Sequence, residues 1–133
     1  MQTRTIKQKV TFKATPMRIY KALIDSAKHA YFTGEAASID PKPGGSFACY
    51  GTYITGFILE LEPKQRIVQA WRSRNWPKGT YSIVSFILKR KTSEKTELTF
   101  VQAGVPAGDY ADKCKGWKTH YWEPLKVFLT KRD

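Results

Sequence analysis

The sequence is poor in the side chains from which most metal and redox sites are built. Its 133 residues include only two cysteines and two histidines. Cys49 falls on a predicted strand and Cys114 on the last predicted helix, at no spacing typical of a metal ligand set. Both are interpreted as small core residues in a reducing compartment, and a disulfide between them is the less favoured alternative. We expect no metal and no cofactor.

The histidines also stand in no arrangement typical of catalysis. His29 follows Asp25 by four residues and can share a helix face with it, which suits a metal site or a base with its orienting carboxylate. Two groups at a single spacing are weak evidence for either. His120 lies six residues after Cys114, so a helix would place these two on different faces. The sequence has no His-Glu-x-x-His, Cys-x-x-Cys, phosphate loop or nucleophile elbow, and we do not expect an enzyme.

Long apolar runs and acidic residues are scarce as well. No segment approaches the roughly 20 apolar residues that cross a bilayer, and the chain enters a strand pattern without a signal-like segment. We therefore expect a soluble cytoplasmic protein with no membrane partner. Eleven acidic residues stand against 23 basic ones, which gives a formal charge of +12. This excess implies attraction to polyanions or to acidic protein surfaces, but the basic residues are scattered, which disfavours a nucleic-acid groove.

What the sequence does contain is a strand pattern interrupted by one helical segment. The length suits a single domain over residues 1–133, and 41% hydrophobic residues can form its core. Ile6, Val10 and Phe12 alternate with polar residues, which predicts a first strand. Thr15-Pro16 marks a helix start, with a break near Asp25-Ser26 and an end at Thr33-Gly34. Further strands are predicted over 36–40, 47–53, 54–61, 66–73, 81–90 and 96–103.

The C-terminal segment predicts one long amphipathic helix lying across this antiparallel sheet. Its apolar stripe consists of Cys114, Trp117, Tyr121, Leu125 and Phe128, and its polar face of Lys115, Thr119, Glu123 and Lys126. Pro124 lies inside the pattern. Because proline cannot donate a hydrogen bond to the carbonyl of His120, we expect the helix to curve there without ending.

Several motifs, in this order of elements, carry a resemblance to a known family. They are Thr15-Pro16, Gly44-Gly45-Ser46-Phe47, Gly56, Pro63, Trp71-Arg72, Trp76-Pro77-Lys78-Gly79, Thr96-Glu97-Leu98 and Gly116-Trp117. The chain resembles the START-like helix-grip superfamily and, within it, the activators of the heat-shock-protein ATPase, in their C-terminal domain. The resemblance implies an α+β helix-grip (Bet v-type) fold, in which a curved antiparallel sheet of six to seven strands wraps a long C-terminal helix, with a short split helix after the first strand.

The resemblance also implies a function. Family members of the co-chaperone type bind the ninety-kilodalton heat-shock protein and promote its ATPase-competent state. Eukaryotic co-chaperones carry an additional N-terminal domain that supplies much of the chaperone contact, and other relatives stand alone; the sequence fits either form. The alternative function is binding of a small apolar ligand under the final helix, where Trp117, Tyr121 and Leu125 would form part of the wall. The chain's own aromatic side chains can equally fill that space.

Two surfaces are candidates for a partner contact. Arg72, Arg74, Trp76 and Lys78 combine an aromatic side chain with basic ones, as contact hot spots do. The alternative for Trp76 is that it folds back as a lid on the core. The strand over 81–88 is apolar on both faces, with Ile83 and Ile87 on one of them. That face can serve as an oligomer or partner surface, or flanking lysine stems can cover it.

Overall fold

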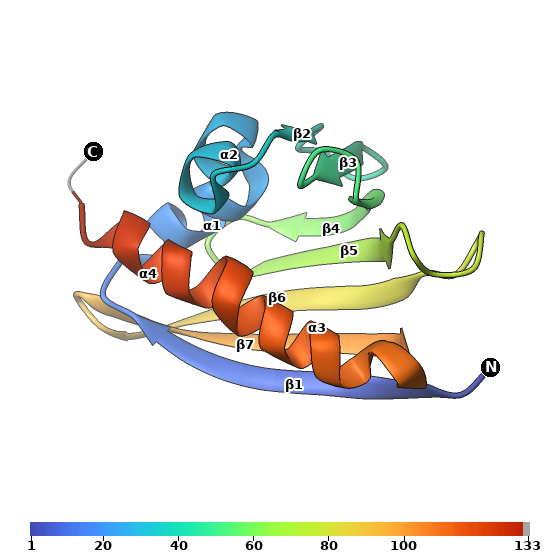
Figure 1. Cartoon of the computed structure of the whole chain (residues 1–133). Coiled ribbons are helices and arrows are strands. Elements are labelled where there is room, and N and C mark those ends of the chain that lie inside the picture. The colour runs from blue at the N-terminus through green and yellow to red at the C-terminus, as the bar shows by residue number, and fades with distance from the viewer. Residues whose placement is uncertain (132–133) are drawn as a thin grey trace.

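In the computed structural model, which describes residues 1–131, seven strands form one antiparallel sheet (Figure 1). The strands are β1 (Thr3–Phe12), β2 (Ala37–Ile39), β3 (Ser46–Cys49), β4 (Ile54–Glu62), β5 (Arg66–Ser73), β6 (Ser82–Thr92) and β7 (Lys95–Pro106). Their order in the sheet is β1-β7-β6-β5-β4-β3-β2. The predicted meander and the α+β helix-grip fold are thus confirmed. Arg132 and Asp133, the last residues of the predicted domain, lie outside the described residues.

The split helix after β1 begins, breaks and ends where the sequence predicts. It consists of α1 (Pro16–Ile24) and α2 (Ser26–Thr33). The Thr15 hydroxyl accepts a hydrogen bond from the Arg18 amide at 3.3 Å. Asp25 separates the two helices, and its carboxylate accepts a bond from the Lys28 amide at 2.9 Å. Gly34 ends α2 with a left-handed backbone (φ 77°) that glycine adopts without steric cost.

The C-terminal segment is helical from residue 107 to residue 129 but not uniform. It runs through η1 (Ala107–Asp109), α3 (Tyr110–Trp117), the π turn η2 (Lys118–Trp122) and α4 (Glu123–Leu129). The helix continues past Pro124, as predicted, and its irregularity takes the form of the wide π turn just before that residue. The Tyr50 hydroxyl donates a 2.6 Å hydrogen bond to the His120 carbonyl. Proline leaves this carbonyl without its usual donor, and Tyr50 replaces it.

Aromatic side chains fill the space between the sheet and the final helix. The ring of Trp117 lies 4.3 Å from that of Phe100 and 4.4 Å from that of Tyr121. Of the predicted apolar stripe, Trp117, Tyr121 and Leu125 are buried, while Cys114 and Phe128 are half-buried. Trp122 is also buried, because the extra residue of the π turn lets two neighbouring side chains point inward.

Two strand boundaries differ from the prediction by more than two residues. The strand expected over 47–53 ends at Cys49, because Tyr50 (φ 54°) and Gly51 (φ 70°) form a left-handed turn. At the other end of the sheet, β7 continues to Pro106 instead of residue 103, because Thr3 of β1 pairs opposite Pro106. Pairing between distant parts of the chain therefore sets that length.

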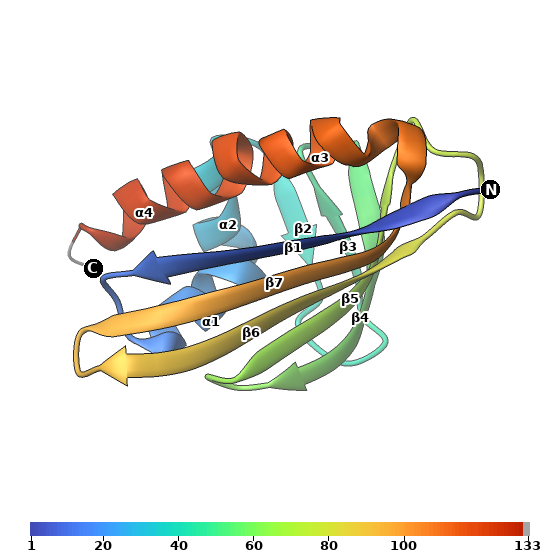
Figure 2. The ribbon, with the colours of Figure 1, turned by 90° about the horizontal axis from the view of Figure 1, so that it is seen from below.

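All helices lie on one side of the sheet, and within residues 1–131 no element covers the other side (Figure 2). The two faces of β6 separate as predicted. Val84, Phe86 and Leu88 are buried beneath the helices, while Ile83 and Ile87 are exposed on the uncovered face. None of the described helices has the length and apolar character that crossing a membrane requires.

Candidate functional site

A groove of about 540 Å³ opens between the first turns of the final helix and the turn that precedes β4. Its apolar lining includes Tyr50, Ile54, Trp71, Trp117 and Tyr121, and polar side chains of α3 and η2 complete it. The structure thus brings two of the three predicted wall residues to this groove. The third, Leu125, lies further along the helix, is fully buried and does not line it.

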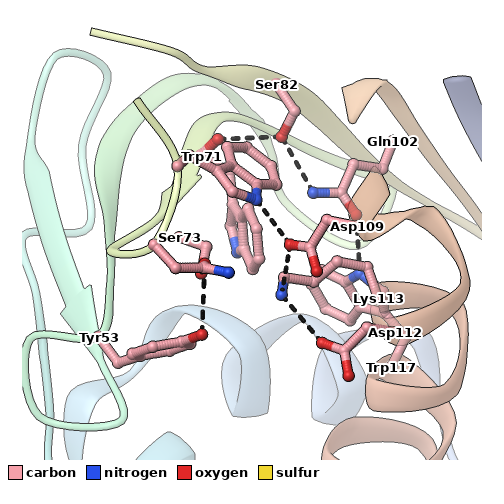
Figure 3. A network of polar contacts seen from close by, with 11 residues as sticks. Tyr53, Trp71, Ser73, Ser82, Gln102, Asp109, Asp112, Lys113 and Trp117 are labelled. Atoms are coloured by element: carbon pink, nitrogen blue, oxygen red, sulfur yellow. Dashed lines mark hydrogen bonds and ion pairs between the residues drawn. The ribbon is translucent and has the colours of Figure 1, made fainter. Parts of the chain in front are cut away.

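A buried ion pair holds one end of this groove (Figure 3). The ammonium of Lys113 lies 2.8 Å from the Asp109 carboxylate and 3.3 Å from that of Asp112. The indole N–H of Trp76 donates to the same Asp109 oxygen at 2.7 Å. Asp109 occupies the N-cap position of α3 but makes no capping bond with its side chain. Its carboxylate instead ties the loop after β5 to the start of the final helix.

The charge of Lys113 is fixed by this pairing. Burial by itself lowers the pKa of Lys113, but the hydrogen bonds to Asp109 and Asp112 and the charge of Asp109 outweigh it, so the pKa lies above the usual value. The side chain therefore stays protonated at neutral pH and cannot act as a base. Lys113 therefore serves as a structural cation in the groove.

A second polar chain positions the tryptophans that line the groove (Figure 3). The Trp117 indole donates to the Gln102 side-chain oxygen at 2.8 Å, and the Gln102 amide donates to the Ser82 hydroxyl at 3.0 Å. Ser82 in turn donates to the Trp71 carbonyl at 2.9 Å. Gln102 was not among the predicted site residues. The available signal was the alternation of side chains along β7, which places Gln102 on the same inward face as Phe100.

His29 is buried in an apolar site and is not paired with Asp25. It is 2% exposed, and its Nε2 lies 3.0 Å from the Tyr121 hydroxyl. The joint site with Asp25 suggested by the spacing is wrong, because that carboxylate caps α2 instead. Burial lowers the pKa of His29 to about 4, so the imidazole is neutral at neutral pH.

Cys49 lies in the same region and is equally inert. Burial raises the pKa of its thiol to about 12, so the nucleophilic thiolate is absent at neutral pH. Cys49 and Cys114 are both free thiols, and the alternative of a disulfide is wrong. Among residues 1–131 no cluster of three His, Cys, Asp or Glu side chains is arranged to hold a metal ion.

The structure divides the four residues predicted to contact a partner into two pairs. The Arg72 guanidinium donates to three backbone carbonyls of the loop after β5. Trp76 is only 5% exposed, with its ring 5.5 Å from that of Trp71. Trp76 is therefore folded back on the core, the alternative considered above. Arg74 and Lys78 are exposed. A partner contact by this loop stays a prediction. Arg74 and Lys78 are the charged side chains of the loop that a partner can reach.

The comparisons with known proteins agree with the fold and name a family. The family model of the "Activator of Hsp90 ATPase homolog 1-like protein" matches residues 13–130. An "Activator of 90 kDa heat shock protein ATPase homolog" from Dictyostelium discoideum is 32% identical over 124 residues, which are 93% of this chain and 32% of that protein. Homolog 1 from Homo sapiens is 29% identical over 124 residues, 93% of this chain and 36% of that protein.

Among solved structures, an HSP90 activator from Plasmodium falciparum superposes with a TM-score of 0.88. Its sequence is 24% identical, and the match covers 95% of this chain and 96% of that one. This likeness concerns the fold. The chain spans about a third of the length of the two curated relatives it matches. Because the family model covers most of the sequence, the chain belongs to the family of Activator of Hsp90 ATPase homolog 1-like proteins.

Proposed function

We propose that this chain is a non-enzymatic module that binds the Hsp90 chaperone and promotes its ATPase-competent state. The observation that carries the proposal is the family match over residues 13–130, with relatives named as activators of that ATPase. The state of the buried polar side chains supports a binding role. His29 is neutral, Cys49 is protonated and Lys113 is paired, so none of them offers general acid–base or nucleophilic chemistry at neutral pH.

Activation without catalytic groups works by population shift. A protein that binds the closed, ATP-competent state of a chaperone more tightly than its open state raises the occupancy of the closed state. The free energy by which the closed state becomes favoured equals the difference between the binding free energies for the closed and the open state. A difference of about 1.4 kcal/mol changes the ratio of the two states tenfold. The chain then needs a surface that recognises the closed state, and no reactive side chain.

The charge distribution supports an acidic partner. Most carboxylates of the described chain form ion pairs with lysine or arginine side chains of the same chain. The ion pairs are Asp40 with Lys42, Glu60 and Glu62 with Arg66, Glu97 with Lys91, and Asp109 and Asp112 with Lys113. The remaining lysines and arginines outnumber the remaining acids, and this excess attracts acidic surfaces and accelerates association with them.

We expect the purified protein to raise the ATPase rate of Hsp90 and to bind it with a salt-dependent affinity. Raising the salt from about 0.05 M to about 0.5 M should weaken binding roughly tenfold, because ions screen the attraction between exposed charges. Parallel ATPase assays and calorimetric titrations measure both effects. Absence of binding at low salt would refute the proposal, whereas an affinity independent of salt would refute only the electrostatic part.

Variants that remove positive charge from one surface at a time show which surface attracts the chaperone. Replacing Arg74 and Lys78 by glutamine should weaken binding about three- to tenfold if the loop after β5 contacts the chaperone. The matched control replaces Lys21 and Lys126, exposed on α1 and α4, by glutamine and removes the same charge from the helical side. Equal losses in the two variants would mean that only the net charge matters.

The groove favours a second candidate function, binding of a small apolar ligand. Its wall of Trp71, Trp117 and Tyr50 suits a flat aromatic molecule. We expect the probe 8-anilinonaphthalene-1-sulfonate, at about ten times its dissociation constant, to raise the Tm by about 4 °C. Gly116→Leu should abolish the shift by filling the groove, and Gly116→Ala, which meets only His120 at 3.9 Å, should keep it. Equal shifts in both variants would place the probe elsewhere.

A further inference from the structure

The uncovered face of the sheet carries a continuous apolar strip. Its large members are Phe57, Leu59, Tyr81, Ile83 and Ile87, which are between 40% and 48% exposed. We call these five side chains the outer strip. They belong to β4, to β6 and to the residue just before β6, and no helix of the described chain lies over them (Figure 2).

The strand register makes the strip contiguous. Phe57 pairs opposite Ala70, and Ala70 pairs opposite Ile83, so only the small side chain of Ala70 separates Phe57 from Ile83. The rings of Phe57 and Tyr81 lie 6.2 Å apart. Of the nine large apolar side chains exposed on the described chain, five lie in this strip. Single exposed apolar residues are ordinary, whereas a cluster of this kind on one face marks an interaction site.

The rim of the strip is positively charged. On the edge strand β1, Lys7 pairs opposite Val101 and Lys9 opposite Thr99, which places both lysines on the same face as the strip, with β7 between them and β6. Neither lysine forms an ion pair with any residue between 1 and 131. On the opposite rim, Glu60 and Glu62 are bound by Arg66 at 2.6 Å and 3.0 Å. The unpaired charge around the strip is therefore basic.

The apolar strip and its basic rim favour some binding partners over others. A second copy of the chain would bring two basic rims together in a protein whose formal charge is +12, which costs electrostatic energy. Single-stranded RNA binds sheets through aromatic side chains that stack on bases. Only Phe57 and Tyr81 are aromatic here, and they pack beside each other; the rest of the strip is aliphatic. An acidic protein surface with apolar side chains can pack against the strip and pair with the lysines at its rim.

We propose that the outer strip is the docking surface for an acidic, apolar segment of the chaperone partner. This inference rests on the proposed function. The strip supplies apolar contact area, and Lys7 and Lys9 meet carboxylates at the edge of the interface. The exposed loop with Arg74 and Lys78 leads from β5 to Tyr81 at one end of the strip.

The test is a binding titration of Hsp90 with matched surface variants. Ile83→Thr/Ile87→Thr keeps β-branched side chains in the strand while removing apolar contact, and should weaken binding about tenfold or more. Lys7→Gln/Lys9→Gln should weaken it about three- to tenfold and reduce its salt dependence. Val127→Thr, on the 58% exposed Val127 of α4, is the control and should leave affinity unchanged. Thermal unfolding of each variant monitors the fold.

The outcomes separate this inference from the proposed function. If the wild-type chain binds and both double variants bind equally well, the docking surface is wrong and the function stands. If the wild-type chain does not bind, the function fails and the docking surface fails with it. Loss of affinity for a single-stranded RNA oligonucleotide in the isoleucine variant, with unchanged chaperone affinity, would overturn the inference in favour of RNA. A wild-type dimer that this variant dissociates, again with unchanged chaperone affinity, would overturn it in favour of self-association.

Discussion

Replacing Trp117 by alanine is expected to lower the free energy of unfolding by about 4 kcal/mol. The side chain is 3% exposed and packs between the final helix and the sheet. Its ring lies 4.3 Å from Phe100, 4.4 Å from Tyr121 and 5.6 Å from both Trp71 and Trp122. Alanine removes these contacts and leaves a cavity that the rigid rings around it cannot close.

Urea unfolding followed by circular dichroism measures this loss. Trp117→Phe separates packing from hydrogen bonding, because it keeps a ring but removes the donor to Gln102. We expect a cost of about 2 kcal/mol for that variant, since the buried Gln102 oxygen loses its partner. Val127→Ala, at an exposed site of α4, is the neutral control, within about 0.5 kcal/mol of wild type. A Trp117→Ala protein as stable as this control would contradict the packing of Trp117 in the core.

Acid is expected to destabilise the protein through His29. The pKa of this residue is lowered from 6.5 to about 4 because burial disfavours the charged imidazolium. As pH falls below 6.5, the unfolded chain takes up a proton before the folded one does. The contribution to stability is therefore complete above pH 6.5 and is lost as pH falls toward 4. At pH 5 the loss relative to neutral pH should be roughly 2 kcal/mol.

A variant without the titrating group isolates this effect. His29→Gln retains a polar side chain near the Tyr121 hydroxyl but cannot gain charge. Stability curves of the wild type and the variant, measured by urea unfolding from neutral pH to pH 5, should diverge by the amount His29 contributes. Parallel curves would mean that His29 titrates alike in the folded and unfolded chain. Carboxylates contribute to acid sensitivity in both proteins and therefore cancel in the difference.

Local patterns were sufficient to predict the elements of this fold. The Thr15 cap, the break at Asp25 and the Gly34 end act over a few residues and follow from short-range chemistry. The alternation along β6 separated a buried from an exposed face because successive strand side chains point to opposite sides. The π turn was not predicted, since a helical stripe assumes 3.6 residues per turn.

The polar contacts around the groove could not be read from sequence. Asp109 is far from Trp76 along the chain, and the bond between them exists only once β5, β7 and α3 meet. The same holds for Tyr50, which donates to the His120 carbonyl, 70 residues away, in place of the donor missing at Pro124. Trp76 shows the limit most directly. Its sequence neighbours, Arg74 and Lys78, suggested an exposed contact, whereas the nearby Trp71 ring and Asp109 carboxylate hold it in the core.

The sequence by itself determined the order of elements, the apolar face of each, the excess of basic charge and the family. These properties depend on residue type and on spacing within one element. Only the tertiary structure decided which side chains share a groove, which histidine and cysteine become inert through burial, and which sheet face remains uncovered. The physical reason is that burial, pairing and pKa depend on the whole surrounding of a group, and most of that surrounding comes from distant parts of the chain.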